Sequence, residues 1–88
     1  LIIEAMAQAG GIIVLTNPIH YGKVALFWAA NNVKFRKSVV PGDQLVMEIE
    51  VIKDKAKFAQ SHGRANVNGE LVAEADMIFS FVEASYLD

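Results

Sequence analysis

An almost unbroken apolar run opens the chain and limits what the sequence can fold into. Residues 1–15 contain only two polar side chains, those of Glu4 and Gln8, and a helix-ending Asn-Pro pair follows at residues 17–18. The pattern predicts a central helix over residues 1–16. Its apolar side chains fall on nearly every side, which is typical of a helix that is buried all round. A membrane-spanning helix needs about 20 apolar residues, so we expect no membrane segment.

Two adjacent glycines lie inside this predicted helix. Gly10 and Gly11 each cost about 1 kcal/mol relative to alanine in a helix interior. We therefore expect another part of the backbone to approach the helix closely at both positions. The helix also begins at Leu1, so we expect the natural polypeptide to continue upstream and the 88 residues to be a fragment of it.

The sequence from residue 23 to residue 83 predicts β-strands. Apolar and acidic residues alternate over residues 45–51, as in a strand with one buried face. Residues 59–67 place small side chains on one face, which suits a strand that a helix crosses closely. Turn or bulge signals separate the strands at Asn31-Asn32, at residues 40–43, at residues 54–57 and at Asn68-Gly69. We predict an α+β fold in one domain of residues 1–88, with an antiparallel sheet of about four strands wrapped around the helix.

The composition excludes several classes of protein and favours a partner subunit. Hydrophobic residues make up 53% of only 88 residues, and a domain this small buries only about 60% of its unfolded surface. We therefore expect apolar surface to be buried against a second copy. A net charge of −2 argues against a nucleic-acid-binding protein. The absence of cysteine excludes disulfides and fits a reducing compartment such as the cytoplasm.

Glu4 is the most informative residue, because a carboxylate is rarely buried without a partner. It can be an exposed acid that complements the positive end of the helix dipole. Alternatively, it is a desolvated carboxyl whose pKa is raised so that it can donate a proton. Gln8 lies four residues later on the same helix face and could orient Glu4 or hold a water. The pattern alone leaves both interpretations open.

Three segments together resemble a known enzyme family. Residues 1–11 (LIIEAMAQAGG) are similar to the central-helix signature of the 3-hydroxyacyl-[acyl-carrier-protein] dehydratases, and residues 33–45 (VKFRKSVVPGDQL) resemble their second signature. Residues 67–75 (VNGELVAEA) resemble their closing strands. Ser38 stands where the family usually has proline. We expect this difference to affect the rigidity of a turn and not the chemistry. The resemblance implies a hotdog fold, in which a sheet wraps one central helix.

The resemblance also implies a reaction. A histidine of a His-Phe-Pro-Gly loop, absent from this chain, would remove the proton next to the thioester carbonyl, and Glu4 would protonate the departing hydroxyl. The histidine and glutamate would come from different subunits of a homodimer, which can assemble further as a trimer of dimers. The substrate would be carried by acyl carrier protein in the cytoplasm. Neither a metal nor an organic cofactor is expected.

Further residues have both a functional and a structural interpretation. Phe27 and Trp28 are candidates for lining an acyl tunnel, although core packing also explains them. Lys34, Arg36 and Lys37 are candidates for binding acyl carrier protein, although a solvated strand face is the simpler explanation. His20 and His62 do not match the family's catalytic histidine, and we expect both to be solvated.

Two other functions remain open from the sequence. A hotdog thioesterase also places a helix carboxylate near a thioester but activates water. A noncatalytic hotdog module would only bind acyl thioesters or dimerise. The Glu4–Gln8 pair and the Val-Pro-Gly-Asp segment at residues 40–43 favour the dehydratase.

Overall fold

A computed structural model describes residues 2–87 and contains one long helix and four long strands. Helix α1 (Ile2–Val14) is followed by the short 3₁₀ turn η1 (Pro18–His20). The strands β1 (Lys23–Phe35), β2 (Leu45–Asp54), β3 (Phe58–Val67) and β4 (Glu70–Glu83) follow, and η2 (Ala84–Leu87) comes last. All neighbouring strands are antiparallel, in the order β1-β4-β3-β2. The predicted α+β arrangement and the strand limits at residues 23 and 83 are confirmed, while α1 ends two residues earlier than predicted.

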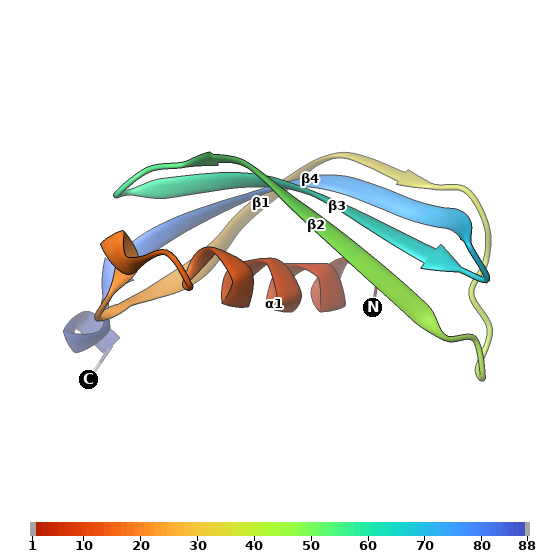
Figure 1. Cartoon of the computed structure of the whole chain (residues 1–88), viewed down its shortest axis with the longest axis horizontal. Helices are drawn as coiled ribbons and strands as arrows, with labels where there is room; N and C mark the ends of the chain where they lie inside the picture. The colour runs from red at the N-terminus through yellow and green to blue at the C-terminus, as the bar shows by residue number, and fades with distance from the viewer. Residues whose placement is uncertain (1, 88) are drawn as a thin grey trace.

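The sheet arches over α1 and covers one side of it (Figure 1). Met6, Gly10 and Val14 form the buried stripe of the helix, at the four-residue spacing that keeps side chains on one face. On the open side, Ile12 is 68% exposed and Ile13 is 39% exposed. The expectation that this chain buries the helix all round is therefore wrong, because the sheet reaches only one of its sides.

The small residues of β3 allow the close contact between helix and sheet. Ala59, Ser61, Gly63 and Ala65 are buried on the face of β3 that looks toward α1. A Cβ atom at Gly63 would lie 2.9 Å from the Sδ atom of Met6, which is closer than real Cβ contacts. The predicted small face of this strand is confirmed.

The two helix glycines differ in their surroundings. A Cβ atom at Gly10 would lie 3.0 Å from the Cζ atom of Phe79. A Cβ atom at Gly11 would meet the same ring at 3.6 Å, an ordinary van der Waals distance. Close packing is therefore confirmed at Gly10, whereas the same prediction is wrong at Gly11. The atoms of the sheet that approach Gly10 belong to side chains, whereas we expected another part of the backbone to approach it.

Bulges and turns fall where the sequence indicates. The register between β1 and β4 shifts between Asn31 and Lys34, and Asn32 has a φ of 52°. A second shift, between Phe27 and Ala29, was not predicted. Asn68 and Gly69 have φ values of 53° and 79°, the positive pair that a type I′ hairpin requires. Within residues 2–87, no helix is long and apolar enough to cross a membrane.

Candidate active site

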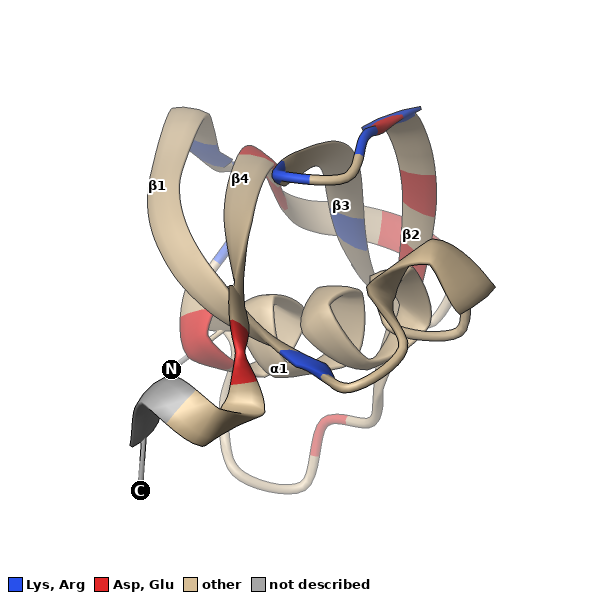
Figure 2. Ribbon diagram, turned by 90° about the vertical axis from the view of Figure 1, so that its left-hand side faces the viewer, with Lys and Arg blue, Asp and Glu red and all other residues tan. Residues whose placement is uncertain are grey.

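Glu4 and Gln8 both lie exposed on α1, one helical turn apart. Glu4 also falls in the first turn, where a carboxylate complements the positive end of the helix. Of the two interpretations, the exposed acid describes Glu4 in this chain, because the sheet covers the opposite side of the helix. Figure 2 shows that charged residues lie mainly on the strands and turns, while α1 is almost uncharged. Glu4 is thus the carboxylate that α1 places at the edge of an apolar surface.

An apolar groove runs beside Gln8 along the helix. Its volume is about 300 Å³, and α1 contributes one wall while β1 and β4 contribute the other. Gln8 is the polar residue of this lining, and its amide lies one turn from Glu4. The groove is lined by Ala7, Gln8, Gly11, Ile12, Leu15, Ala25, Phe27 and Phe79.

Phe27 and Trp28, the two candidates for lining an acyl tunnel, have different surroundings in the structure. Phe27 lines the groove, and its ring centroid lies 5.8 Å from that of Phe79. Trp28 occupies the register shift between Phe27 and Ala29, is 74% exposed and does not line the groove. The two side chains therefore do not share the wall of this groove within the single chain.

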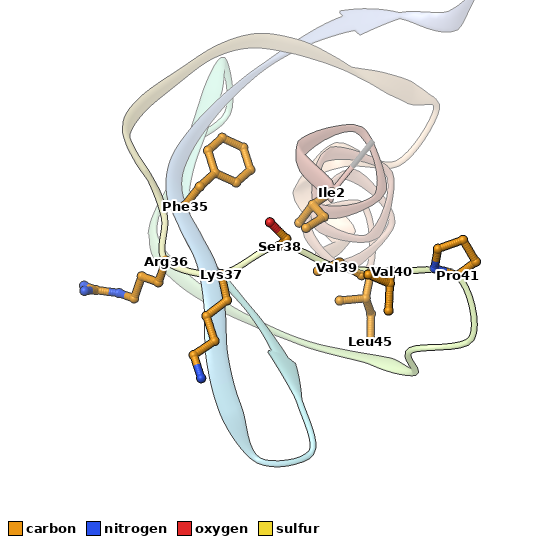
Figure 3. A pocket seen from close by; sticks show the side chains of 9 residues that line it. All are labelled: Ile2, Phe35, Arg36, Lys37, Ser38, Val39, Val40, Pro41 and Leu45. Atoms are coloured by element: carbon orange, nitrogen blue, oxygen red, sulfur yellow. The ribbon is translucent and has the colours of Figure 1, made fainter.

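A larger pocket of about 800 Å³ lies at the amino-terminal end of α1 (Figure 3). Ile2 and Leu45 form part of its wall, together with the segment from Phe35 to Pro41. In Figure 3, Phe35 points toward the helix, while Arg36 and Lys37 point away from it. The sequence analysis did not predict this pocket. Its only signal was the second family signature at residues 33–45, which supplies most of the lining.

The three basic residues are exposed, and two of them are paired with acids of the same chain. Arg36 Nη2 lies 3.0 Å from Glu74 Oε2, and Lys37 Nζ lies 2.5 Å from Glu70 Oε2. The hydrogen bond from Arg36 is the main reason that the pKa of Glu74 lies below its ordinary value, and Lys34 adds to the effect. Lys34 lies in β1 as the sequence suggested, whereas Arg36 and Lys37, which make the ion pairs, follow the end of that strand.

His62 lies between two carboxylates on the outer face of the sheet. Its Nδ1 atom is 2.6 Å from Asp76 Oδ1, and its Nε2 atom is 3.3 Å from Glu74 Oε1. Asp76 also accepts a hydrogen bond from Asn32 at 2.8 Å. The bonds from Asn32 and His62 hold the pKa of Asp76 below its ordinary value, against the opposing effect of burial. The expectation of a freely solvated His62 is wrong, because strand pairing sets it opposite Asp76.

His20 is buried and is not the solvated residue that the sequence suggested. Its ring stacks on Phe81 with a centroid distance of 3.5 Å, and its Nε2 atom lies 2.5 Å from Asp54. Asp54 also accepts a bond from Asn17 at 3.0 Å. Burial raises the pKa of Asp54, but these two hydrogen bonds outweigh it and hold the pKa below its ordinary value. The sequence analysis missed this cluster, because its members are far apart in the chain.

Among residues 2–87, no group of three or more His, Asp or Glu side chains is placed to hold a metal ion. The candidate site thus consists of Glu4 and Gln8 at one end of an apolar groove.

The family model described as a FabA-like domain matches residues 1–76. The chain belongs to the FabA-like family. Curated relatives of this family member are named 3-hydroxyacyl-[acyl-carrier-protein] dehydratase FabZ.

The relative from Desulforamulus reducens is 45% identical over 80 residues, which cover 91% of this chain and 56% of the relative. The relative from Lawsonia intracellularis is 54% identical over 78 residues, which cover 85% of this chain and 51% of the relative. The chain therefore spans about half the length of the curated relatives that it matches.

Solved structures show the same fold at low sequence identity. The smu.793 protein of Streptococcus mutans, solved bound to acetyl CoA, has a TM-score of 0.79 at 17% identity, covering 93% of this chain and 63% of its own. A hot-dog-like protein of Thermanaerovibrio acidaminovorans has a TM-score of 0.78 at 21% identity, covering 98% of this chain and 62% of its own. The hotdog fold implied by the sequence signatures is therefore confirmed.

Proposed function

We propose that the protein acts, within a longer polypeptide, as a dehydratase on 3-hydroxyacyl chains attached to acyl carrier protein. The observation that carries this proposal is the position of Glu4, exposed on α1 one turn from the amide of Gln8, which lines an apolar groove. A carboxyl group beside an apolar groove suits a substrate with a polar reacting end and an apolar tail. The names of the curated relatives support the same reaction.

The reaction is a β-elimination that neither oxidises nor reduces the substrate. A base removes a proton from the carbon next to the thioester carbonyl, and the hydroxyl leaves from the following carbon. Glu4 gives its proton to that hydroxyl, directly or through a water held by Gln8, so that water departs and a trans double bond forms. The base is the histidine of the family's His-Phe-Pro-Gly loop, which lies outside these 88 residues. The elimination itself requires no metal or organic cofactor.

The groove beside Gln8 receives the acyl chain. Phe27 and Phe79 form its aromatic wall, and Ala7, Gln8, Gly11, Ile12 and Leu15 form the helical wall. Trp28 contributes to the acyl site from a neighbouring subunit, because within one chain it does not line the groove. Trp28 is 74% exposed in the single chain, and burying its large apolar ring against a second subunit would be more favourable than leaving it in water.

A homodimer is the working unit in this proposal. Ile12 on the open side of α1, and Trp28 and Phe35 on the edge strand β1, remain exposed in the single chain. A second copy would bury this apolar surface, and its approach would also desolvate Glu4. We extend the assembly to a trimer of dimers and place the protein in the cytoplasm. Lys34, Arg36 and Lys37 would receive the acidic acyl carrier protein.

Glu4→Gln in the full-length protein tests the proposal. The substitution keeps the shape of the side chain but removes its transferable proton, so formation of the enoyl product should fall by roughly 10²–10⁴. Glu83→Gln, which removes an exposed acid at the end of β4, is the matched control and should keep its activity. The 88-residue chain alone should form no enoyl product, since it lacks the histidine loop.

The same assay separates the rival functions. Release of free thiol without enoyl product would indicate a thioesterase instead. Binding of an acyl thioester with neither product would indicate a noncatalytic module. Full activity of Glu4→Gln would exclude Glu4 as the catalytic acid.

A further inference from the structure

We propose that Gly11 sets the length of acyl chain that the protein accepts, by leaving the middle of the groove open. The inference rests on the proposed dehydratase function and assigns a specificity role to one residue. Glycine is among the least favourable residues in a helix interior, so its presence here calls for a reason. Close packing explains Gly10, which meets the Phe79 ring, but it does not explain Gly11.

Gly11 occupies the centre of the helical wall of the groove. On α1 the wall runs from Gln8 past Gly11 to Leu15, and these residues share one helix face. A Cβ atom at Gly11 would lie 3.6 Å from Cε1 of Phe79 and 3.9 Å from Cβ of Ala25. Both are groove-lining residues, so the added methyl would span the groove from the helix toward the sheet. Neither distance is a clash, and the methyl therefore fits the fold while it fills the groove.

The distance between Glu4 and Gly11 determines how long an acyl chain must be to contact this methyl group. Seven residues separate Glu4 from Gly11, and a helix rises 1.5 Å per residue, so the two positions lie about 10 Å apart along the axis. An extended chain advances about 1.2 Å per bond, as the polypeptide backbone does. The tail beyond the reacting carbon must therefore span about eight bonds to reach Gly11. A four-carbon acyl chain stops well short of it, and a sixteen-carbon chain passes it.

Gly63 of β3 provides a control that disturbs the core away from the groove. It is buried, and neither Gly63 nor the side chains that a Cβ atom there would meet line the groove. That Cβ atom would lie 2.9 Å from Sδ of Met6 and 3.0 Å from Cε of Met77, so the core must shift to admit it. Gly63→Ala should therefore lower stability without narrowing the groove. Gly11→Ala should melt at or above the wild-type temperature, because alanine is the better helix former.

The test measures kcat/KM of the full-length protein for 3-hydroxyacyl thioesters of four and sixteen carbons. Gly11→Ala should lower the ratio of long-chain to short-chain kcat/KM by about 10-fold or more, the typical effect of one methyl group in an apolar pocket. The Gly63→Ala variant should keep the wild-type ratio. The ratio is insensitive to the fraction of folded enzyme, because both substrates meet the same enzyme preparation.

The outcomes separate this inference from the function on which it rests. Wild-type enzyme that dehydrates neither substrate would overturn both the function and the inference. Wild-type enzyme that dehydrates both, with an unchanged ratio in Gly11→Ala, would overturn the inference and leave the function standing. An equal fall of the ratio in Gly63→Ala and Gly11→Ala would also overturn it, since general disturbance of the core would then explain both.

Discussion

The Nε2 atom of His20 lies 2.5 Å from the Oδ1 atom of Asp54, a residue 34 positions away in the sequence. This contact ties the loop after α1 to the end of β2. Asn17 strengthens it with a second hydrogen bond to Asp54, and Phe81 of β4 supports the histidine ring from one side. The carboxyl end of the helix is thereby attached to the sheet, beside the apolar cluster of Val14, Ala59 and Phe81.

Asp54→Asn should lower the free energy of unfolding at pH 7 by about 1.5–3 kcal/mol, the usual contribution of a hydrogen bond to a charged group. The pKa of Asp54 is lower in the folded chain than in the unfolded one, where it is about 3.9. Its stabilising effect is therefore complete above that value and is lost as the pH falls through the folded pKa. Urea unfolding at pH 7 and below pH 4 measures this, with Glu83→Gln as control. A stability difference that persists unchanged in acid would contradict the assignment.

Gly63 and Met6 should be energetically coupled. A Cβ atom at Gly63 would lie 2.9 Å from Met6 Sδ, so Gly63→Ala forces that side chain to move and should destabilise the protein by about 1–3 kcal/mol. In a Met6→Ala background the shortest contact of this Cβ atom is gone while those to Met77 and Ile49 remain, and the same substitution should cost less. A double-mutant cycle by thermal or urea unfolding should give a coupling of about 0.5–3 kcal/mol. Additive effects would show that helix and strand do not approach closely here.

The pKa of Asp76 should depend on its two hydrogen-bond donors. The hydrogen bond from Asn32 is the largest single cause that holds this pKa below its ordinary value, and His62 adds both a hydrogen bond and a charge interaction. Asn32→Gly removes the amide but tolerates the positive φ of 52° at this bulge, so it should raise the Asp76 pKa. His62→Gln should also raise it. Carboxyl titration by NMR gives both values, and an Asp76 pKa that neither substitution raises would contradict the bonding seen in the structure.

The association rate with acyl carrier protein should follow the charge near Lys37. If Lys34, Arg36 and Lys37 receive an acidic partner, Lys34→Glu should slow association at low ionic strength on the order of tenfold. Glu70→Gln should speed it, because the acid that pairs with Lys37 would be neutral. Surface plasmon resonance with full-length protein at low and high salt measures both rates, and Glu83→Gln is again the control. If neither substitution changes the association rate, acyl carrier protein does not bind at these three basic residues.

The sequence alone predicted the elements because their signals are local. The apolar run with its Asn-Pro end marked the helix, the alternation over residues 45–51 marked β2, and Asn68-Gly69 marked the last hairpin. The small residues of β3 also predicted correctly that the helix crosses that strand closely. Each signal depends on residues a few positions apart, where the period of the element decides which side chains share a face. The family signatures added the hotdog fold, for which periodicity has no distinctive pattern.

The tertiary structure decided which residues meet across the fold. The packing of the loop after α1 on the sheet brings His20 to Asp54. The register of β3 against β4 sets His62 opposite Asp76, and a one-residue change of register would turn these two side chains to opposite faces. Phe27 lines the groove, while Trp28 at the neighbouring register shift does not. Gly10 and Gly11 are adjacent in the sequence, yet the rotation of α1 against the sheet packs one on Phe79 and leaves the other in the groove. Such contacts join residues far apart in the chain, and the local pattern that forms each element does not specify how the elements are packed together.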